Sequence, residues 1–238
     1  TSRNNKYRPK VLSMEPLTGV ALIQAKYLEE KQETLAKDLA GAITIMGQQL
    51  CSSPTEGYII GDTAEPLRKD FFVELVNKLE ENYQFQNSAE ANVIKLDRIL
   101  TKAIDSGARV YTSQKYGNLI SIINSDDQSF FKKTDSTINL SIHSRNNFLE
   151  LINIDSFESA YETVSQISEK VTHDQIKKIQ TILVFGDKDF WGEAINLAKI
   201  VDAYRVIDLN YVLKRHPLEP LDGIHLVEEF TYPIAILD

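Results

Sequence analysis

The sequence predicts an α/β fold: a mostly parallel sheet flanked by helices, with antiparallel additions and an N-terminal helical extension. Residues 181–208 show the pattern strand, helix, strand, and such a crossover places two parallel strands in one sheet. Residues 88–113 show a helix, a glycine and a short apolar strand, which is the order of a parallel α/β unit. Two short runs of alternating apolar and polar residues, 118–124 and 137–143, indicate antiparallel strands joined by a polar loop.

The N-terminal part divides into two segments. Residues 1–16 are predicted to be a basic flexible tail, either a solubilising tail or an arm that binds phosphate or a partner. Its basic residues are Arg3, Lys6, Arg8 and Lys10, and its first ten residues contain no acid. Residues 17–52 are predicted to be an amphipathic helical extension, because apolar residues recur at spacings of seven, four, four, three and four. They are Leu28, Leu35, Leu39, Ile43, Met46 and Leu50.

The rest of the chain, residues 57–238, is predicted to be the α/β domain. The turn-forming stretch CSSPTEG, residues 51–57, indicates a linker before it. Pro66 suits the first turn of a helix, and Ser88, Ser156 and Thr172 are candidate N-caps of later helices. The remaining elements are predicted as strands at 57–62, 108–113, 181–185, 204–210 and 232–238, and as helices at 66–83, 88–107, 156–171, 172–180 and 190–199.

Composition limits the classes of function. The formal net charge of −8 argues against broad affinity for nucleic acid or anionic membranes. No apolar run approaches the roughly 20 residues of a membrane span, and no signal-like segment is visible, so we expect an intracellular, most simply cytoplasmic, protein. The single cysteine, Cys51, excludes an internal disulfide. A Cys51–His pair stays open, although no neighbour in sequence activates the thiol.

Nothing in the sequence indicates a bound cofactor. Glycine makes up 10 of 238 residues, and neither a GxGxxG nor a GxxxxGK[ST] phosphate-binding pattern is present. The four histidines show no spacing typical of metal ligands. We therefore predict no cofactor, unless the acidic residues bind Mg²⁺ or Mn²⁺.

Acidic residues follow several predicted strands. In open parallel sheets, ligands bind at the carboxyl ends of the strands. Oxygen ligands gathered there suit Mg²⁺ or Mn²⁺. The candidate ligands are Asp62, Asp187, Asp189 and Asp208.

The segment ILVFGDKDF, followed by an amphipathic helix, resembles the Gly-Asp-x-Asp-Phe segment of PIN- and NYN-type ribonucleases and flap-type 5′ nucleases. The resemblance implies a metal-binding role for Asp187 and Asp189, and Asp62 is the nearest equivalent of the aspartate that ends the first strand in those families. The alternative is structural, because an aspartate at a strand-to-helix junction caps the helix.

Weighing these patterns, we predict a non-catalytic α/β subunit that acts by protein–protein interaction as an assembly or scaffold component. Its partner would bind through the N-terminal helical region or through Trp191, and nucleic acid could bind through the basic tail. The alternative is a divalent-metal-dependent nuclease or phosphohydrolase of PIN/NYN-like type that uses the strand-end aspartates.

Overall fold

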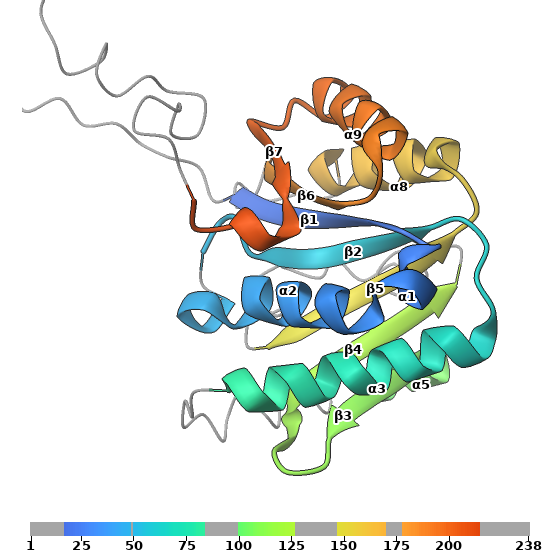
Figure 1. Ribbon diagram of the computed structural model, residues 1–238, viewed down its shortest axis with the longest axis vertical. Helices are drawn as coiled ribbons and strands as arrows, with labels where there is room; N and C mark the ends of the chain where they lie inside the picture. Colours follow the sequence, from blue (N-terminus) through green and yellow to red (C-terminus); the bar gives the residue numbers. More distant parts are fainter. Residues whose placement is uncertain (1–16, 49, 84–99, 127–146, 170–177, 215–238) are drawn as a thin grey trace, which may run out of the picture.

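The computed structural model describes residues 17–48, 50–83, 100–126, 147–169 and 178–214. They form an α/β fold around a seven-stranded sheet with the strand order β3-β4-β5-β2-β1-β6-β7 (Figure 1). Neighbouring strands are parallel, except that β3 and β4 are antiparallel. The strands are β1 (Leu17–Gln24), β2 (Pro54–Ile60), β3 (Arg109–Ser113), β4 (Gly117–Asp126), β5 (Phe148–Ile154), β6 (Lys178–Phe185) and β7 (Arg205–Asp208). The predicted fold class, an α/β fold with a mostly parallel sheet, flanking helices and an antiparallel addition, is confirmed.

Helices cover both faces of this sheet (Figure 1). Residues of α1, α2 and α3 pack with the sheet in one buried apolar cluster, and residues of α8 and α9 pack with its other face in a second cluster. The helices are α1 (Tyr27–Glu30), α2 (Gln32–Thr44), α3 (Glu65–Asn82), α5 (Thr101–Asp105), α8 (Phe157–Glu169) and α9 (Lys188–Ile200), with 3-10 turns η1 (Ile45–Gln48) and η3 (Leu209–Tyr211). No helix in the described ranges is both long and apolar enough to cross a membrane.

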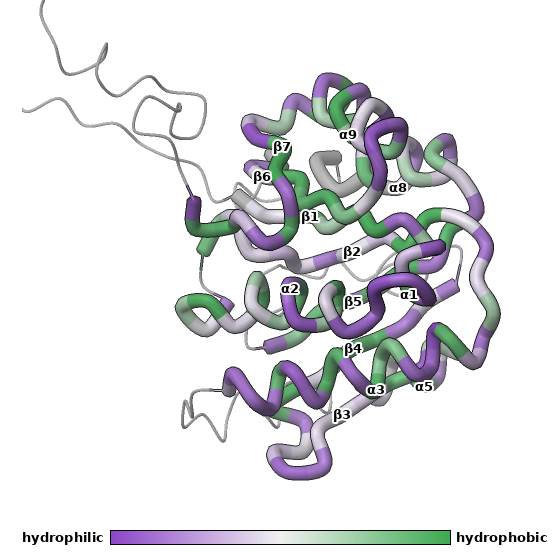
Figure 2. The backbone as a smooth tube through the Cα atoms, in the orientation of Figure 1, coloured by the Kyte–Doolittle hydropathy of each residue, from purple (hydrophilic) through white to green (hydrophobic). Residues whose placement is uncertain are grey.

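The central strands are apolar on both sides because helices cover both faces. In β1, residues 20–23 are completely buried. Figure 2 shows hydrophobic stretches along β4, β6 and β7, whereas α3 and α9 alternate between hydrophobic and hydrophilic turns. This alternation is the expected pattern for helices that cover a sheet with one side and face solvent with the other.

The structure corrects the predicted N-terminal organisation. Residues 17–24 are not helical: they form β1, which lies between β2 and β6 in the sheet. Helix α2 was correctly predicted as amphipathic, but its apolar side packs in the same buried cluster as α3 and the sheet. The segment 17–52 is therefore part of the α/β layers and not an extension, and the α/β unit begins before residue 57.

The antiparallel addition differs in its partner from the one predicted. Strand β4 pairs antiparallel with β3 and parallel with β5. The predicted partner, residues 137–143, lies outside the described residues, as do residues 1–16 and 232–238 and the candidate caps Ser88 and Thr172.

Several local predictions are confirmed. Pro66 lies in the first turn of α3. Ser156 precedes α8, and its hydroxyl accepts a hydrogen bond from the backbone N–H of Ser159 at 3.4 Å. The crossover β6–α9–β7 joins two parallel strands.

Candidate functional site

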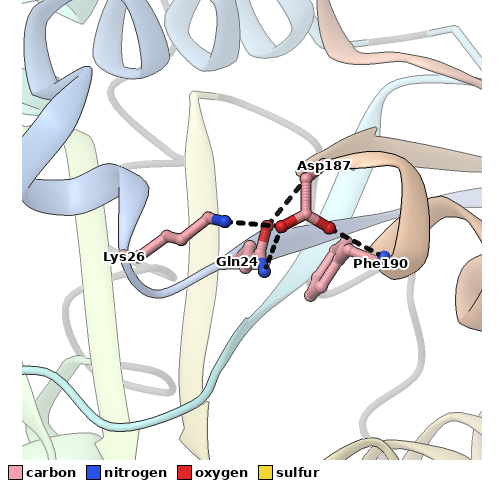
Figure 3. Close-up of polar contacts among 4 residues, drawn as sticks. All are labelled: Gln24, Lys26, Asp187 and Phe190. Atoms are coloured by element: carbon pink, nitrogen blue, oxygen red, sulfur yellow. Dashed lines mark hydrogen bonds and ion pairs between the residues drawn. The ribbon is translucent and has the colours of Figure 1, made fainter.

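At the carboxyl edge of the sheet, Asp187 caps helix α9. The chain leaves β6 through Gly186, and the Asp187 carboxylate accepts a hydrogen bond from the backbone N–H of Phe190 at 3.0 Å (Figure 3). This contact satisfies one of the free N–H groups at the start of the helix and places negative charge at the positive end of its dipole.

The other oxygen of Asp187 joins α9 to the end of β1. The Lys26 ammonium lies 2.5 Å from Asp187 Oδ2, and the Gln24 amide donates to the same oxygen at 3.0 Å. In return, the backbone N–H of Asp187 donates to Gln24 Oε1 at 3.0 Å. The hydrogen bond from Lys26, then those from the Phe190 N–H and Gln24, hold the pKa of Asp187 well below its usual range. Its charge is thus balanced by Lys26 within the fold.

The other predicted metal ligands are dispersed. Asp208 caps η3, because its carboxylate accepts from the backbone N–H of Asn210 at 3.1 Å. Asp62 follows β2, which is separated from β6 by β1. Asp189 is exposed in the first turn of α9. Within the described ranges, no group of three or more histidine, cysteine, aspartate or glutamate side chains is arranged to hold a metal ion.

The predicted partner-binding residues have different outcomes. Trp191 is only partly buried and packs against the apolar cluster between the sheet and helices α8 and α9. Arg3, Lys6, Arg8 and Lys10 lie outside the described residues, so binding of a partner or nucleic acid through them stays a prediction.

The role of Asp187 as a charged cap predicts a pH dependence of stability. Because its pKa is lowered by folding, its contribution is present above the unfolded-state pKa of about 4 and is lost as the pH falls below it. Asp187→Asn keeps a capping side chain but removes the charge. We expect the free energy of unfolding, measured with urea at pH 7, 5 and 3, to fall less steeply in this variant than in the wild type. Asp189→Asn, on the same helix turn, is the control and should follow the wild-type curve.

A second polar site lies at the opposite, amino edge of the sheet, around the only cysteine. Between α2 and β2 the backbone passes through three consecutive residues in the left-handed region, with φ of 50° at Met46, 61° at Gly47 and 64° at Gln48. This conformation is strained for residues other than glycine. A turn closed by the backbone hydrogen bond from Ser53 N–H to the Leu50 carbonyl (3.0 Å) follows.

The buried side chain of Gln48 fixes this loop to the sheet. Its amide donates to the carbonyl oxygens of Pro54 (2.8 Å) and Phe148 (2.6 Å), and its Oε1 accepts from the backbone N–H of Phe148 at 3.0 Å. It thereby links the first residues of β2 and β5. The Gln48 side chain therefore holds the start of the loop before β2, and the pairing of β2 in the sheet holds its end.

Gly19 lets the loop approach β1 closely. In the register of the sheet, Gly19 lies between Pro54 of β2 and Thr181 of β6. A β-carbon on Gly19 would lie 2.5 Å from the carbonyl oxygen of Ser52, closer than two such atoms can come. Glycine at this position is therefore required for the loop to lie where it does.

Cys51 is half-buried in this loop, and its sulfur contacts β6. The Gln180 amide nitrogen lies 2.9 Å from Cys51 Sγ, and the Thr181 hydroxyl donates to Gln180 Oε1 at 3.1 Å. The neighbouring Ser53 hydroxyl is buried and has no hydrogen-bond partner among the described residues. The Cys51 sulfur thus lies within hydrogen-bond distance of a neutral donor, in a loop that Gln48 fixes to the sheet.

Sequence reasoning missed this site. Residues 51–57 were predicted to be a linker, whereas β2 begins at Pro54. One signal in the sequence could have indicated this site. The single cysteine follows a glycine that interrupts the helical pattern, and it precedes a buried strand. Its hydrogen-bonding partner lies 129 residues away in sequence.

No protein-family model and no curated protein sequence matches the chain. The fold is similar to that of solved aldehyde dehydrogenases. One is succinate-semialdehyde dehydrogenase from Burkholderia pseudomallei, with a TM-score of 0.55 at 12% identity over 87% of this chain and 41% of that protein. Another is the P. syringae indole-3-acetaldehyde dehydrogenase AldA, a cysteine-to-alanine mutant solved with NAD+ and IAA, with a TM-score of 0.53 at 12% identity over 87% and 40%. A third is glyceraldehyde-3-phosphate dehydrogenase GapN from Methanocaldococcus jannaschii with NADP, with a TM-score of 0.51 at 14% identity over 86% and 41%.

These similarities correct three predictions. The three solved proteins named above are aldehyde dehydrogenases, so the predicted non-catalytic scaffold and the alternative nuclease or phosphohydrolase are both wrong. The prediction of no cofactor, or of Mg²⁺ or Mn²⁺ alone, is wrong as well, because two of these structures were solved with NAD+ or NADP. At this level of identity the similarity defines the fold, and the chain spans about two fifths of the length of each of these dehydrogenases.

Proposed function

We propose that this chain is the thiol-bearing part of an aldehyde-dehydrogenase-like enzyme, with Cys51 as the nucleophile that attacks the substrate carbonyl carbon. The observation that carries the proposal is the placement of Cys51. Within a fold shared with aldehyde dehydrogenases, the only sulfhydryl of the chain is half-buried at the sheet edge and faces a hydrogen-bond donor at 2.9 Å. An intracellular, reducing location, as the sequence predicts, would keep this thiol free.

The chemistry that this site supports begins with covalent capture. The Cys51 thiolate forms a bond from Sγ to the carbonyl carbon, the electron pair of the C=O bond moves to oxygen, and the oxygen takes up a proton to give a hemithioacetal. No oxidant is consumed in this step. The residues described here supply the nucleophile and the rigid loop that presents it.

Oxidation of that adduct requires a hydride acceptor, and NAD(P) is the cofactor that we infer for the complete enzyme. In a parallel sheet its phosphates would bind at the carboxyl edge of the strands, and one helix N-terminus there, that of α9, does not fit them. The N-terminus of α9, at the carboxyl edge of the sheet, is filled by the Asp187 carboxylate, which would repel a phosphate. We therefore place no cofactor contact at the N-terminus of α9.

Protection of Cys51 by aldehydes tests the proposal. The chain has one cysteine, so mass spectrometry after iodoacetamide treatment reports on one site only. Succinate semialdehyde, indole-3-acetaldehyde and glyceraldehyde-3-phosphate are the first substrates to test. At about ten times its dissociation constant, a captured aldehyde should slow labelling roughly tenfold, because only about one thiol in eleven stays free.

The matched controls are the carboxylic acids that correspond to these aldehydes, since an acid resembles its aldehyde in size but forms no hemithioacetal. Equal protection by acid and aldehyde would show simple occlusion of the thiol and would argue against covalent capture. No protection by any aldehyde, at concentrations up to the limit of solubility, would overturn the proposal.

A further inference from the structure

Two buried asparagine side chains lie near each other at the carboxyl ends of β4 and β5. Asn124 and Asn153 are both more than nine-tenths buried. They share the face of the sheet that α3 covers, because each comes two residues after an apolar residue, Ile122 or Leu151, of the buried cluster that includes α3. In the register of the sheet, Asn124 lies opposite Leu151, and Asn153 lies opposite Asp126. The two asparagines are therefore diagonal neighbours on one face.

Each asparagine amide uses its nitrogen and leaves its oxygen unmet. Asn124 Nδ2 donates to the Leu151 carbonyl oxygen at 3.1 Å, and Asn153 Nδ2 donates to Asp126 Oδ1 at 2.7 Å. Neither Oδ1 atom accepts a hydrogen bond from any residue that the structure describes. Exchanging oxygen and nitrogen within either amide would only turn an oxygen toward another acceptor. Two neighbouring buried acceptors thus lack a donor, which is uncommon in folded proteins.

Arg68 of α3 brings an unmet donor to the same place. Its Nη1 lies 3.5 Å from Asp126 Oδ1, the oxygen that also accepts from Asn153. Its Nε–H is buried and has no hydrogen-bond partner within the described ranges. The charges of Arg68 and Asp126 balance each other, which favours an uncharged ligand. The side chains of this ion pair are 21% and 54% exposed, so the pair forms the solvent side of the site and the asparagines form its buried side.

We propose that Asn124, Asn153 and Arg68 form a binding site for a primary carboxamide at the carboxyl ends of β4 and β5. The NH₂ group of such a ligand donates one hydrogen to each asparagine Oδ1, and its carbonyl oxygen accepts from Arg68 Nε–H. A carboxylate has no donor for the two oxygens, and an ammonium ion has no acceptor for the arginine. This inference does not depend on aldehyde capture, because Cys51 precedes β2 at the opposite edge of the sheet.

Nicotinamide is the probe for this site, and nicotinate, which has an oxygen in place of the NH₂ group, is its matched control. We expect nicotinamide to bind at least about tenfold more tightly, because the acid leaves both asparagine oxygens unmet and adds a negative charge beside them. NMR titration at neutral pH gives both dissociation constants. The side-chain NH₂ signals of Asn124 and Asn153 should shift with nicotinamide.

Three results would overturn the proposal. One is equal binding of the amide and the acid, and another is no binding of nicotinamide up to its limit of solubility. The third concerns water, which also offers two donors and an acceptor. A crystal grown with nicotinamide that shows only a water molecule at the two asparagine oxygens would assign the site to water.

Substitutions test the individual contacts. Asn153→Leu removes one acceptor at similar volume, and nicotinamide binding should weaken about fivefold. Arg68→Lys keeps the charge beside Asp126 but removes the Nε–H, so binding should weaken about threefold, and this variant serves if the leucine variant fails to fold. Lys69→Ala, at the next and exposed position of α3, is the control and should bind as the wild type does. Unchanged affinity in a folded Asn153→Leu or in Arg68→Lys would contradict the proposal.

The same titration with NAD+ and with acetamide identifies the source of the carboxamide. NAD+ binding that weakens in Asn153→Leu would assign the site to the nicotinamide end of the cofactor inferred above. Binding of acetamide and nicotinamide without NAD+ would assign it to a free amide, and both results support a carboxamide site. A failure of aldehyde capture would leave these dissociation constants as predicted, whereas a failure of the carboxamide site would leave aldehyde protection of Cys51 intact.

Discussion

If the proposed function holds, replacing Cys51 with alanine is expected to lower the kcat for aldehyde oxidation at least about 10³-fold, because the nucleophile for covalent capture is removed. No second cysteine is available in the chain to take over. Alanine fills part of a half-buried position in a loop that Gln48 and Gly19 hold independently of the sulfur, so the fold should be retained.

The measurement is NAD(P)H formation, followed by absorbance, with the wild type and the variant at equal concentration. Asp187→Asn, at the opposite edge of the sheet, is the control and should keep wild-type activity. A Cys51→Ala enzyme with more than about a tenth of the wild-type kcat would show that another group carries the reaction. Loss of activity in Asp187→Asn alone would indicate that the active site lies at the carboxyl edge of the sheet and not near Cys51.

The strand–helix–strand unit at residues 181–208 was predictable because its signals are local. An apolar run ends at Gly186, and Asp187 follows at the position of a helix cap. These features depend on residues within one helical turn of each other. The same locality explains why the capping interpretation of Asp187 could be stated from sequence: the contact with the Phe190 N–H spans three residues.

Strand β1 was not predictable in the same way. Its buried residues, 20–23, form a continuous apolar run without alternation, because both faces of a central parallel strand are covered. Such a run cannot be distinguished from a buried helix by periodicity alone. The apolar spacing typical of a helix begins a few residues later, in the segment that forms α2. The helix predicted from that spacing was therefore extended backwards over the residues of β1.

The candidate site could not be predicted because its contacts are long-range. Cys51 meets Gln180 across 129 residues, and Gln48 meets Phe148 across 100. The sequence CSSP has the composition of a turn, and Cys51 and Ser52 do lie in one, whereas Pro54 already belongs to β2. Only the strand order, which places β1 between β2 and β6, shows that this turn lies close to the Gln180 amide of β6.

The second large effect is expected for Gln48→Ala, which should lower the free energy of unfolding by roughly 2–5 kcal/mol. The substitution removes three hydrogen bonds to backbone groups at the starts of β2 and β5 and leaves a void in a completely buried position. Alanine and glutamine both carry a β-carbon, so the strain of the positive φ at this residue is the same in both proteins. The loss therefore measures the side-chain contacts.

Urea unfolding of the two proteins gives this difference, and Met46→Ala is the matched control. Met46 belongs to the same turn and also has a positive φ, but its side chain is 70% exposed, so we expect a change within about 0.5 kcal/mol. A loss below about 1 kcal/mol in Gln48→Ala would show that water or a shifted loop replaces the lost hydrogen bonds. Because the same side chain fixes the loop that carries Cys51, the folded variant should also show altered iodoacetamide labelling of Cys51, whereas Met46→Ala should label at the wild-type rate.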